Sequence, residues 1–182
     1  SSSRICCKRC NTIHIYDIMK KHEIIIGIDP DTIKSGIAVL ETKTRKMEIA
    51  TLEFPKLIDY VKWAYDKSIE TNQTIVVIIE AGWLNAKSNF HGQTGNIGQR
   101  VAKNVGANHQ TGKHIVEMCE FYGIHTELQK PLNKGWNGTN GKITHEELAY
   151  FTGITGKTSQ DGRDAALIAW NYAGFPIKVK AK

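Results

Sequence analysis

The chain has 182 residues, enough for one ordinary domain with a buried core but too few for two large lobes. Its 41% hydrophobic and 23% charged residues are typical of a globular protein, and no apolar run approaches the roughly 20 residues that a membrane helix needs. Lys and Arg number 24 against 18 acidic residues, and this net charge of +6 favours a polyanionic partner without identifying one.

The first residues differ in composition from the rest. Residues 1–22 are rich in serine and cysteine and show no clear period, so we expect a disordered extension or tag, with Met19 as the natural start and no signal-peptide pattern. Cys7 and Cys10 form one C-x-x-C, but the second pair typical of structural zinc is missing, although His14 or His22 could contribute. We expect a cytosolic protein whose domain covers residues 23–176 and is followed by a basic tail, 177–182.

Regular patterning begins at residue 24. Apolar runs at 24–28 and 36–40 flank a polar turn that contains Asp29, which predicts a hairpin with strands at 24–29 and 35–41, and residues 46–54 alternate as a third strand. Pro55 opens a predicted helix to about residue 70. The β-branched run TIVVII at 74–79 is typical of a buried strand, and it ends directly on Glu80.

The second half alternates helices and strands. A glycine-rich loop over 81–98 precedes a long helix from 96 or 98 to 122, a strand at 124–128 and a polar loop at 129–141. A short helix at 143–151, capped by Thr144 with Glu147 three residues on, and a last helix at 161–172 follow. A three-strand meander followed by alternating elements predicts an α/β fold, a mixed sheet with helices on both faces.

Four acidic residues stand where carboxylates are informative: Asp29, Glu80, Asp161 and Asp164. The first two end strands that are apolar on both faces, where an unpaired carboxylate is costly. The last two are three residues apart and so share one helix face. Magnesium and manganese prefer hard oxygen ligands, and two such ions about 4 Å apart can activate a water and stabilise a leaving oxygen in phosphodiester cleavage.

Each acid also has an ordinary structural explanation. An Asp-Pro-Asp turn needs no metal, Glu80 could simply end its strand, and Asp161 could be an N-cap with Asp164 at the third helical position. The joint occurrence of all four acids, in this order within one fold, favours a metal site.

Three segments resemble the RuvC Holliday junction resolvases of the RNase H-like superfamily: IIIGIDPDTIKSGIAVL, TIVVII with Glu80, and DGRDAALIA. The resemblance spans residues 23–172. It implies a five-stranded mixed sheet, a homodimer, and magnesium- or manganese-dependent nicking of four-way DNA junctions with two ions per active site. By the same resemblance Asp29, Glu80, Asp161 and Asp164 are the catalytic metal ligands, in a bacterial or phage-encoded enzyme.

The resemblance extends less specifically to DNA contacts. Trp83 falls where the family carries an aromatic residue at the junction crossover, and Lys142 falls near the family's DNA-contacting lysines. Lys87, Arg100 and Lys103 flank the glycine-rich loop and could meet phosphates, although a loop tryptophan and surface lysines also occur without such roles.

This chain departs from the family at residue 31, which is Asp where the family usually has glycine, and in the loop 131–142. Three other functions stay open at this point. They are cleavage of other branched DNA or of RNA/DNA hybrids, nucleic-acid binding without catalysis, and nucleotide binding by a small actin-like domain.

Overall fold

The computed structural model describes residues 22–85, 96–133 and 135–178. Most of the predicted extension, Lys87 and the end of the basic tail lie outside these ranges. Within them, no helix combines the length and the apolar character needed to cross a bilayer.

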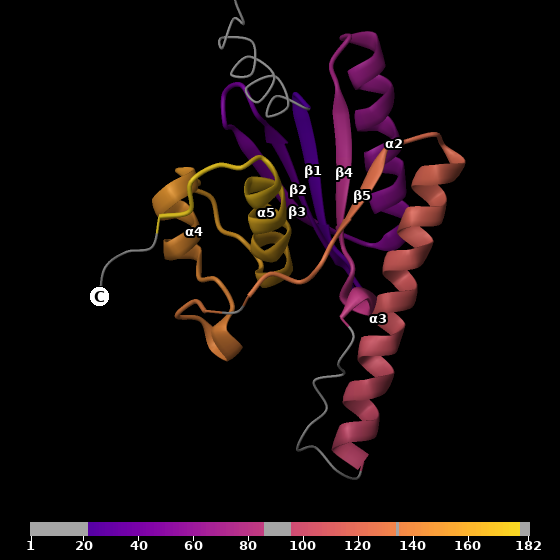
Figure 1. Cartoon of the computed structure of the whole chain (residues 1–182), viewed down its shortest axis with the longest axis vertical. Coiled ribbons are helices and arrows are strands. Elements are labelled where there is room, and N and C mark those ends of the chain that lie inside the picture. Colours follow the sequence, from indigo (N-terminus) through magenta and orange to yellow (C-terminus); the bar gives the residue numbers. More distant parts are fainter. Residues whose placement is uncertain (1–21, 86–95, 134, 179–182) are drawn as a thin grey trace, which may run out of the picture.

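Five strands form one sheet, in the order β3-β2-β1-β4-β5 (Figure 1). β1 is antiparallel to β2, β2 is antiparallel to β3, and β4 is parallel to both β1 and β5. The predicted RNase H-like mixed sheet is therefore confirmed. The strands are β1 (Ile24–Asp29), β2 (Ser35–Glu41), β3 (Met47–Leu52), β4 (Ile75–Glu80) and β5 (Thr126–Gln129).

Two strand boundaries differ from the sequence prediction. β3 ends at Leu52 because Glu53 is already the N-cap of the next helix, whose first turn contains Pro55. The fifth strand begins at Thr126 rather than at residue 124. Gly123, in a left-handed conformation with φ 69°, ends the preceding helix, and Ile124 is buried against that helix layer before pairing begins.

Helices cover both faces of the sheet, as predicted (Figure 1). α2 (Phe54–Glu70) and α3 (Asn96–Phe121) pack on one face, and α5 (Gln160–Tyr172) packs on the other with α4 (His145–Thr152) beside it. Two 3₁₀ turns, η1 (Gly82–Leu84) and η2 (Thr139–Gly141), lie in the connections after β4 and β5. Thr144 and Glu147 form the predicted capping box of α4.

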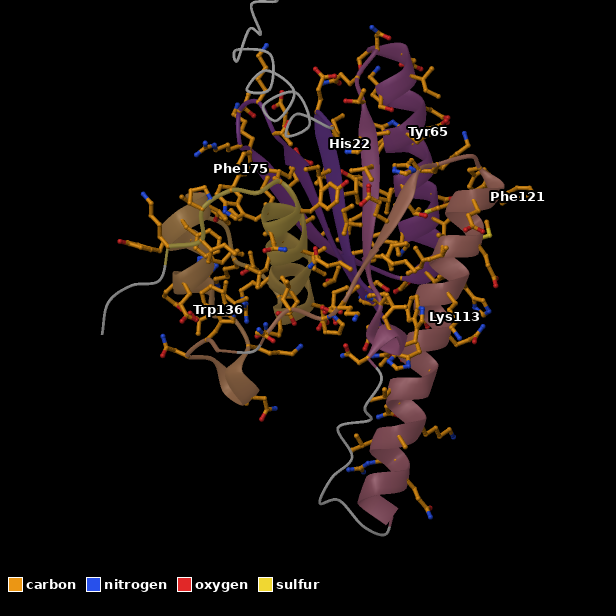
Figure 2. The ribbon with its side chains drawn as sticks, viewed as in Figure 1. His22, Tyr65, Lys113, Phe121, Trp136 and Phe175 are labelled. Atoms are coloured by element: carbon orange, nitrogen blue, oxygen red, sulfur yellow. The ribbon has the colours of Figure 1, made fainter. Side chains whose placement is uncertain are left out.

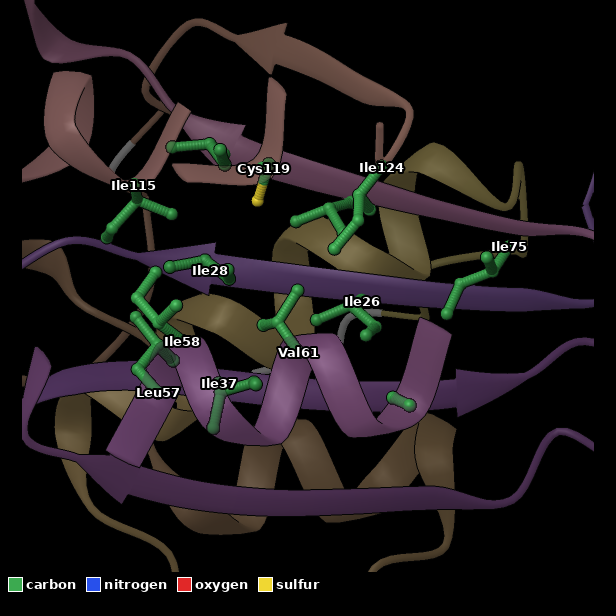
Figure 3. Packing of buried hydrophobic residues seen from close by; sticks show 13 residues of the cluster. Ile26, Ile28, Ile37, Leu57, Ile58, Val61, Ile75, Ile115, Cys119 and Ile124 are labelled. Atoms are coloured by element: carbon green, nitrogen blue, oxygen red, sulfur yellow. The ribbon is translucent and has the colours of Figure 1, made fainter. Parts of the chain in front are cut away.

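The two faces of β1 and β4 bury alternate residues in different cores. Ile26 and Ile28 of β1 and Val77 of β4 contact the α2 and α3 layer, where Ile115 of α3 is fully buried (Figure 3). The alternate residues of both strands, among them Ile25, face α5. Because side chains alternate with period two, this assignment also decides the side on which the last residue of each strand lies.

α5 lies unusually close to the sheet. A Cβ atom built on Gly27 would overlap the backbone carbonyl of Ala165, and one built on Gly36 would overlap the carbonyl of Asp161. Gly27 faces Ala165 and Ala169 of the helix, and Gly36 faces Asp161 and Gly162, so the backbones approach directly at both strand positions. α5 starts earlier than predicted, with Ser159 as its N-cap, and the Ser159 hydroxyl oxygen accepts a hydrogen bond from the Gly162 N–H.

Candidate functional site

The register of the parallel pair β1–β4 brings two of the predicted acids together. Ile28 pairs with Ile79, so Asp29 and Glu80 are the next residues on adjacent strands. Both have the parity of the residues that face α5, since Ile25 and Ile78 lie in that core. Two acids about fifty positions apart in the chain thus meet at one edge of the sheet.

α5 adds the other two acids. Asp29, Asp161 and Asp164 each offer a carboxylate oxygen, and these three oxygens all lie within 4.8 Å of one another. Glu80 is outside that set of three, but it lines the same hollow as Asp29 and Asp164, and it is the carboxylate whose charge acts most strongly on Asp29. The structure therefore brings together all four acids that the sequence singled out.

Asp161 is not the N-cap of α5, which was one of its ordinary explanations. Ser159 occupies that position, so Asp161 lies in the first turn of the helix, where its charge is favourable toward the helix dipole. Its carboxylate remains directed at the other acids rather than at the helix end.

The site carries more negative than positive charge, and this charge together with burial raises the pKa values of Asp29 and Asp161. Burial, followed by the charges of Glu80 and Asp164, raises the pKa of Asp29 to about 8. Burial, together with the charges of Asp31 and Asp164, also raises the pKa of Asp161. At neutral pH such a cluster either keeps a proton or gains a cation.

Lys142 is the positive charge within this cluster. Its Nζ donates to Asp164 Oδ2 at 2.7 Å, and both side chains are mostly buried, with exposed fractions of 31% and 18%. Burial lowers the pKa of Lys142, but the hydrogen bond to Asp164 and the charges of Asp164 and Asp29 outweigh burial and raise it overall. Among the described residues, the charges of Lys142 and Arg163 do not offset burial and the neighbouring carboxylates at Asp161, whose pKa is raised overall, so the cluster favours further cations.

Two residues that the sequence analysis did not single out orient this lysine and its partner. Gln160 donates from Nε2 to Asp164 Oδ1 at 2.9 Å, so each oxygen of Asp164 accepts a hydrogen bond. Arg163 Nε donates to the carbonyl oxygen of Ile143 at 3.0 Å, which holds the residue next to Lys142. The spacing of Gln160 and Asp164, four apart on a helix, is the sequence signal that could have indicated the first contact.

The donor set fits a hard divalent cation. All candidate ligands are carboxylate oxygens, which magnesium and manganese prefer, and they come from two adjacent strands and one helix. The raised pKa of Asp29 is the expected consequence of carboxylates assembled without their counter-charge. Asp29, Asp161 and Asp164, with Glu80, are the residues that would hold such ions.

A hollow of about 80 Å³ opens beside the acids. One wall is polar, with Asp29, Glu80, Lys142 and Asp164. The other is largely apolar and comes from the loop after β5 and from α5, with Pro131, Leu132, Trp136, Ile143 and Leu167. Figure 2 shows Trp136 on the α4 and α5 side of the sheet, while Lys113 lies on α3 on the opposite side.

The predicted DNA-contacting residues are distributed more widely. Trp83 lies in η1, half-buried, with its ring edge-on to His109 of α3 at 6.1 Å between centroids. Arg100 and Lys103 are exposed on the N-terminal half of α3, which extends beyond the strand ends (Figure 1). Lys87 lies outside the described residues. Lys142 is thus the predicted basic residue that the structure places among the four acids.

No family model matches the chain, and no curated protein matches it. Several solved structures match the chain. Thermus thermophilus RuvC in complex with a Holliday junction substrate is 14% identical with a TM-score of 0.45, covering 81% of this chain and 90% of that one. Another T. thermophilus RuvC structure is 15% identical with a TM-score of 0.41, covering 83% and 96%.

The Fowlpox virus resolvase, in a complex with its substrate Holliday junction DNA, is 13% identical with a TM-score of 0.36, covering 83% of this chain and 97% of that one. RuvC, the family that the sequence motifs resemble, is thus among the similar solved structures. The fold class rests on the strand order and register described above, and the function rests on the site.

Proposed function

We propose that this protein is a divalent-metal-dependent endonuclease that resolves four-way DNA junctions by phosphodiester hydrolysis. One observation carries the proposal. Asp29, Glu80 and Asp164 line one hollow together with Lys142, and a carboxylate oxygen of Asp161 lies within 4.8 Å of those of Asp29 and Asp164. Burial with the charges of Glu80 and Asp164 raises the pKa of Asp29 to about 8. A site of this charge and ligand type is suited to two magnesium or manganese ions.

The position of each residue in the site suggests its role. Asp29, at the centre of the cluster, together with Glu80, Asp161 and Asp164 would hold the ions. When bound, divalent ions at such a site supply activation of a water and stabilisation of the leaving oxygen. Gln160 and Lys142 fix both oxygens of Asp164, so this carboxylate is oriented before any ligand arrives. The ammonium group of Lys142 also faces the hollow and would offset the charge of a phosphate there.

Branched DNA is the substrate favoured by the features around the site. The chain carries a net charge of +6, and α3 presents Arg100 and Lys103 beyond the edge of the sheet that holds the acids. Trp83 in η1 directly follows the strand that ends on Glu80, within reach of DNA bound at the site. A two-fold homodimer would offer two such sites to a two-fold junction, one for each symmetric strand.

Cleavage assays on labelled substrates test the proposal. A four-way junction, a linear duplex and an RNA/DNA hybrid are each incubated with magnesium or with EDTA, and symmetric nicks are expected in the junction alone and in magnesium alone. Preferential cleavage of the hybrid would instead assign the same site to RNA/DNA substrates. Nucleotide-dependent thermal stabilisation without DNA binding would refute a nuclease function.

Substitution of the central acid tests the chemistry. Asp29→Asn is expected to abolish magnesium-dependent cleavage, because the carboxylate common to the cluster is lost, while junction binding in EDTA stays within about threefold of the wild type. Asp59→Asn, an exposed position on α2, is the matched control. Undiminished cleavage by Asp29→Asn would refute the proposed mechanism.

A further inference from the structure

The residue at which the chain departs from its resemblance, Asp31, is bonded to a helix that is distant in sequence. Asn108 of α3 donates from Nδ2 to Asp31 Oδ2 at 3.1 Å, and Asn108 Oδ1 accepts from the backbone N–H of Thr32 at 3.2 Å. One amide side chain therefore both donates to and accepts from the turn that follows Asp29. A two-point contact of this kind fixes orientation as well as distance.

The turn itself is internally bonded. The second oxygen of Asp31, Oδ1, accepts from the N–H of Ile33 at 2.8 Å, and the Asp31 N–H donates to Ser35 Oγ at 3.0 Å. Ser35 is only 1% exposed and begins β2. Both carboxylate oxygens of Asp31 thus have partners in the protein, and Asp31 is not among the three acids whose oxygens lie within 4.8 Å of one another.

A second contact lies one helical turn farther along α3. Gly112 is buried, and a Cβ built there would lie 3.2 Å from Pro30 Cγ and 2.6 Å from the ring of Trp83. Asn108 and Gly112 are four residues apart and share one stripe of the helix. This stripe touches Pro30, Asp31 and Thr32, the residues that directly follow Asp29.

The contact joins two parts of the proposed site. Asp29 is the last residue of β1, so the position of its carboxylate depends on the turn that continues from it. α3 runs on past the strand ends and carries exposed Arg100 and Lys103 on that projecting half (Figure 1). Asn108 and Gly112 are thus the positions at which this helix contacts the turn.

We propose that Asp31 and Asn108 are positioning residues: their hydrogen bond clasps the turn after Asp29 to α3 and so holds the Asp29 carboxylate in register with Asp161 and Asp164. The clasp also makes the position of Asp29 depend on the position of α3. This inference rests on the proposed metal-dependent nuclease function for its kinetic consequence, but its effect on metal binding can be measured without any DNA.

A reciprocal exchange tests the clasp. Asp31→Asn leaves one acceptor oxygen for two donors, Asn108 Nδ2 and the Ile33 N–H, and Asn108→Asp places two carboxylates face to face, so neither single variant keeps the full set of hydrogen bonds. The double variant Asp31→Asn/Asn108→Asp restores it. In the double variant the amide at position 31 donates to the carboxylate at position 108, which still accepts from the Thr32 N–H. Net charge is the same as in the wild type.

Two readouts are used, affinity for Mn²⁺ alone and single-turnover cleavage of a four-way junction. Each single variant is expected to lose about tenfold in Mn²⁺ affinity and in cleavage rate, with the KM for the junction changed by less than about threefold, because the ligands are displaced while the DNA-facing surface is kept. The double variant is expected to recover to within about threefold of the wild type. Gln110→Ala, an exposed position on the same helix bonded only to His114 among the described side chains, is the control.

The outcomes are distinct. Single variants that fold and keep wild-type Mn²⁺ affinity and cleavage rate would overturn the clasp. A double variant no better than the single variants would also overturn it, and that result is expected if Asp31 is itself a metal ligand. If a single variant fails to fold, Asn108→Ser replaces it, and recovery of the double variant decides. If the wild type binds Mn²⁺ but does not cleave junctions, the proposed function fails while the Mn²⁺ titrations still decide the clasp.

Discussion

The close approach of α5 to the sheet makes Gly36→Ala the sharpest test of how the site is assembled. Gly36 pairs with Asp29 across β1 and β2, and it lies directly beneath the first turn of α5. A Cβ at this position would overlap the carbonyl of Asp161 and would lie 2.9 Å from the N–H nitrogen of Gly162. The added methyl group therefore meets backbone atoms of the segment that carries Asp161.

The magnitude follows from these contacts. Ordinary van der Waals contact begins near 3.4 Å, so the Gly162 nitrogen must retreat by at least about 0.5 Å and the Asp161 carbonyl by more. Backbone shifts of this kind in a packed interior cost roughly 1–3 kcal/mol. A displacement of 0.5–1 Å of a ligand also lowers rates by about 10- to 100-fold. Gly36→Ala should therefore fold, with reduced stability and a disproportionate loss of cleavage.

The assay compares urea unfolding, Mn²⁺ titration and single-turnover junction cleavage for Gly36→Ala and for Gly156→Ala. A Cβ at Gly156 meets nothing within 4 Å and its φ is not in the left-handed range, so this control should be neutral in all three measurements. Wild-type Mn²⁺ affinity and rate in a folded Gly36→Ala variant would refute the inference that the glycine contact positions Asp161.

The remaining predictions concern charge and packing. In EDTA, Asp29 keeps a proton up to a pH of about 8 in the folded protein but loses it near 3.8 in the unfolded chain, so the folded state binds more protons between these values. The free energy of unfolding of the protein should therefore fall as pH rises from 5 to 8, by up to about 1.4 kcal/mol per pH unit. Asp29→Asn should flatten this pH dependence in thermal melts. Magnesium competes with that proton, so it should raise the Tm more at pH 8 than at pH 6, and an equal increase would contradict the assignment. Lys142→Gln removes the ammonium bonded to Asp164 and should slow junction cleavage by about 10- to 100-fold, whereas Lys62→Gln, which breaks a surface ion pair, should not. Trp83→Ala should lower the Tm, because the ring packs on α3, and should slow cleavage of intact junctions more than of flexible ones; equal slowing of both would indicate a folding role alone.

Local patterns in the sequence were enough for the elements and their order. The β-branched runs of β1 and β4, the proline at the start of α2 and the capping box of α4 each specify a local conformation, so their prediction depended on no distant contact. Two buried strands ending on Asp29 and Glu80, and two acids spaced for one helix face, were also sufficient to nominate the four carboxylates.

What the sequence left open depends on residues far apart in the chain. Nothing local distinguishes Ser159 from Asp161 as N-cap of α5, since both residue types cap helices and only the docked helix shows which one does. Arg163 acquires its contact with the carbonyl oxygen of Ile143 across a segment whose path depends on packing.

The sequence by itself determined that this protein has a mixed α/β fold with four candidate metal-binding acids. Only the tertiary structure decided that these acids meet. The register of β1 on β4 and the close packing of α5 against the strand glycines are both set by long-range contacts. The tertiary structure also showed the contact between Asp31, the residue that departs from the family pattern, and Asn108 of α3. A hydrogen bond between residues 77 positions apart leaves no local pattern in the sequence, because the two residues meet only when α3 packs beside the turn.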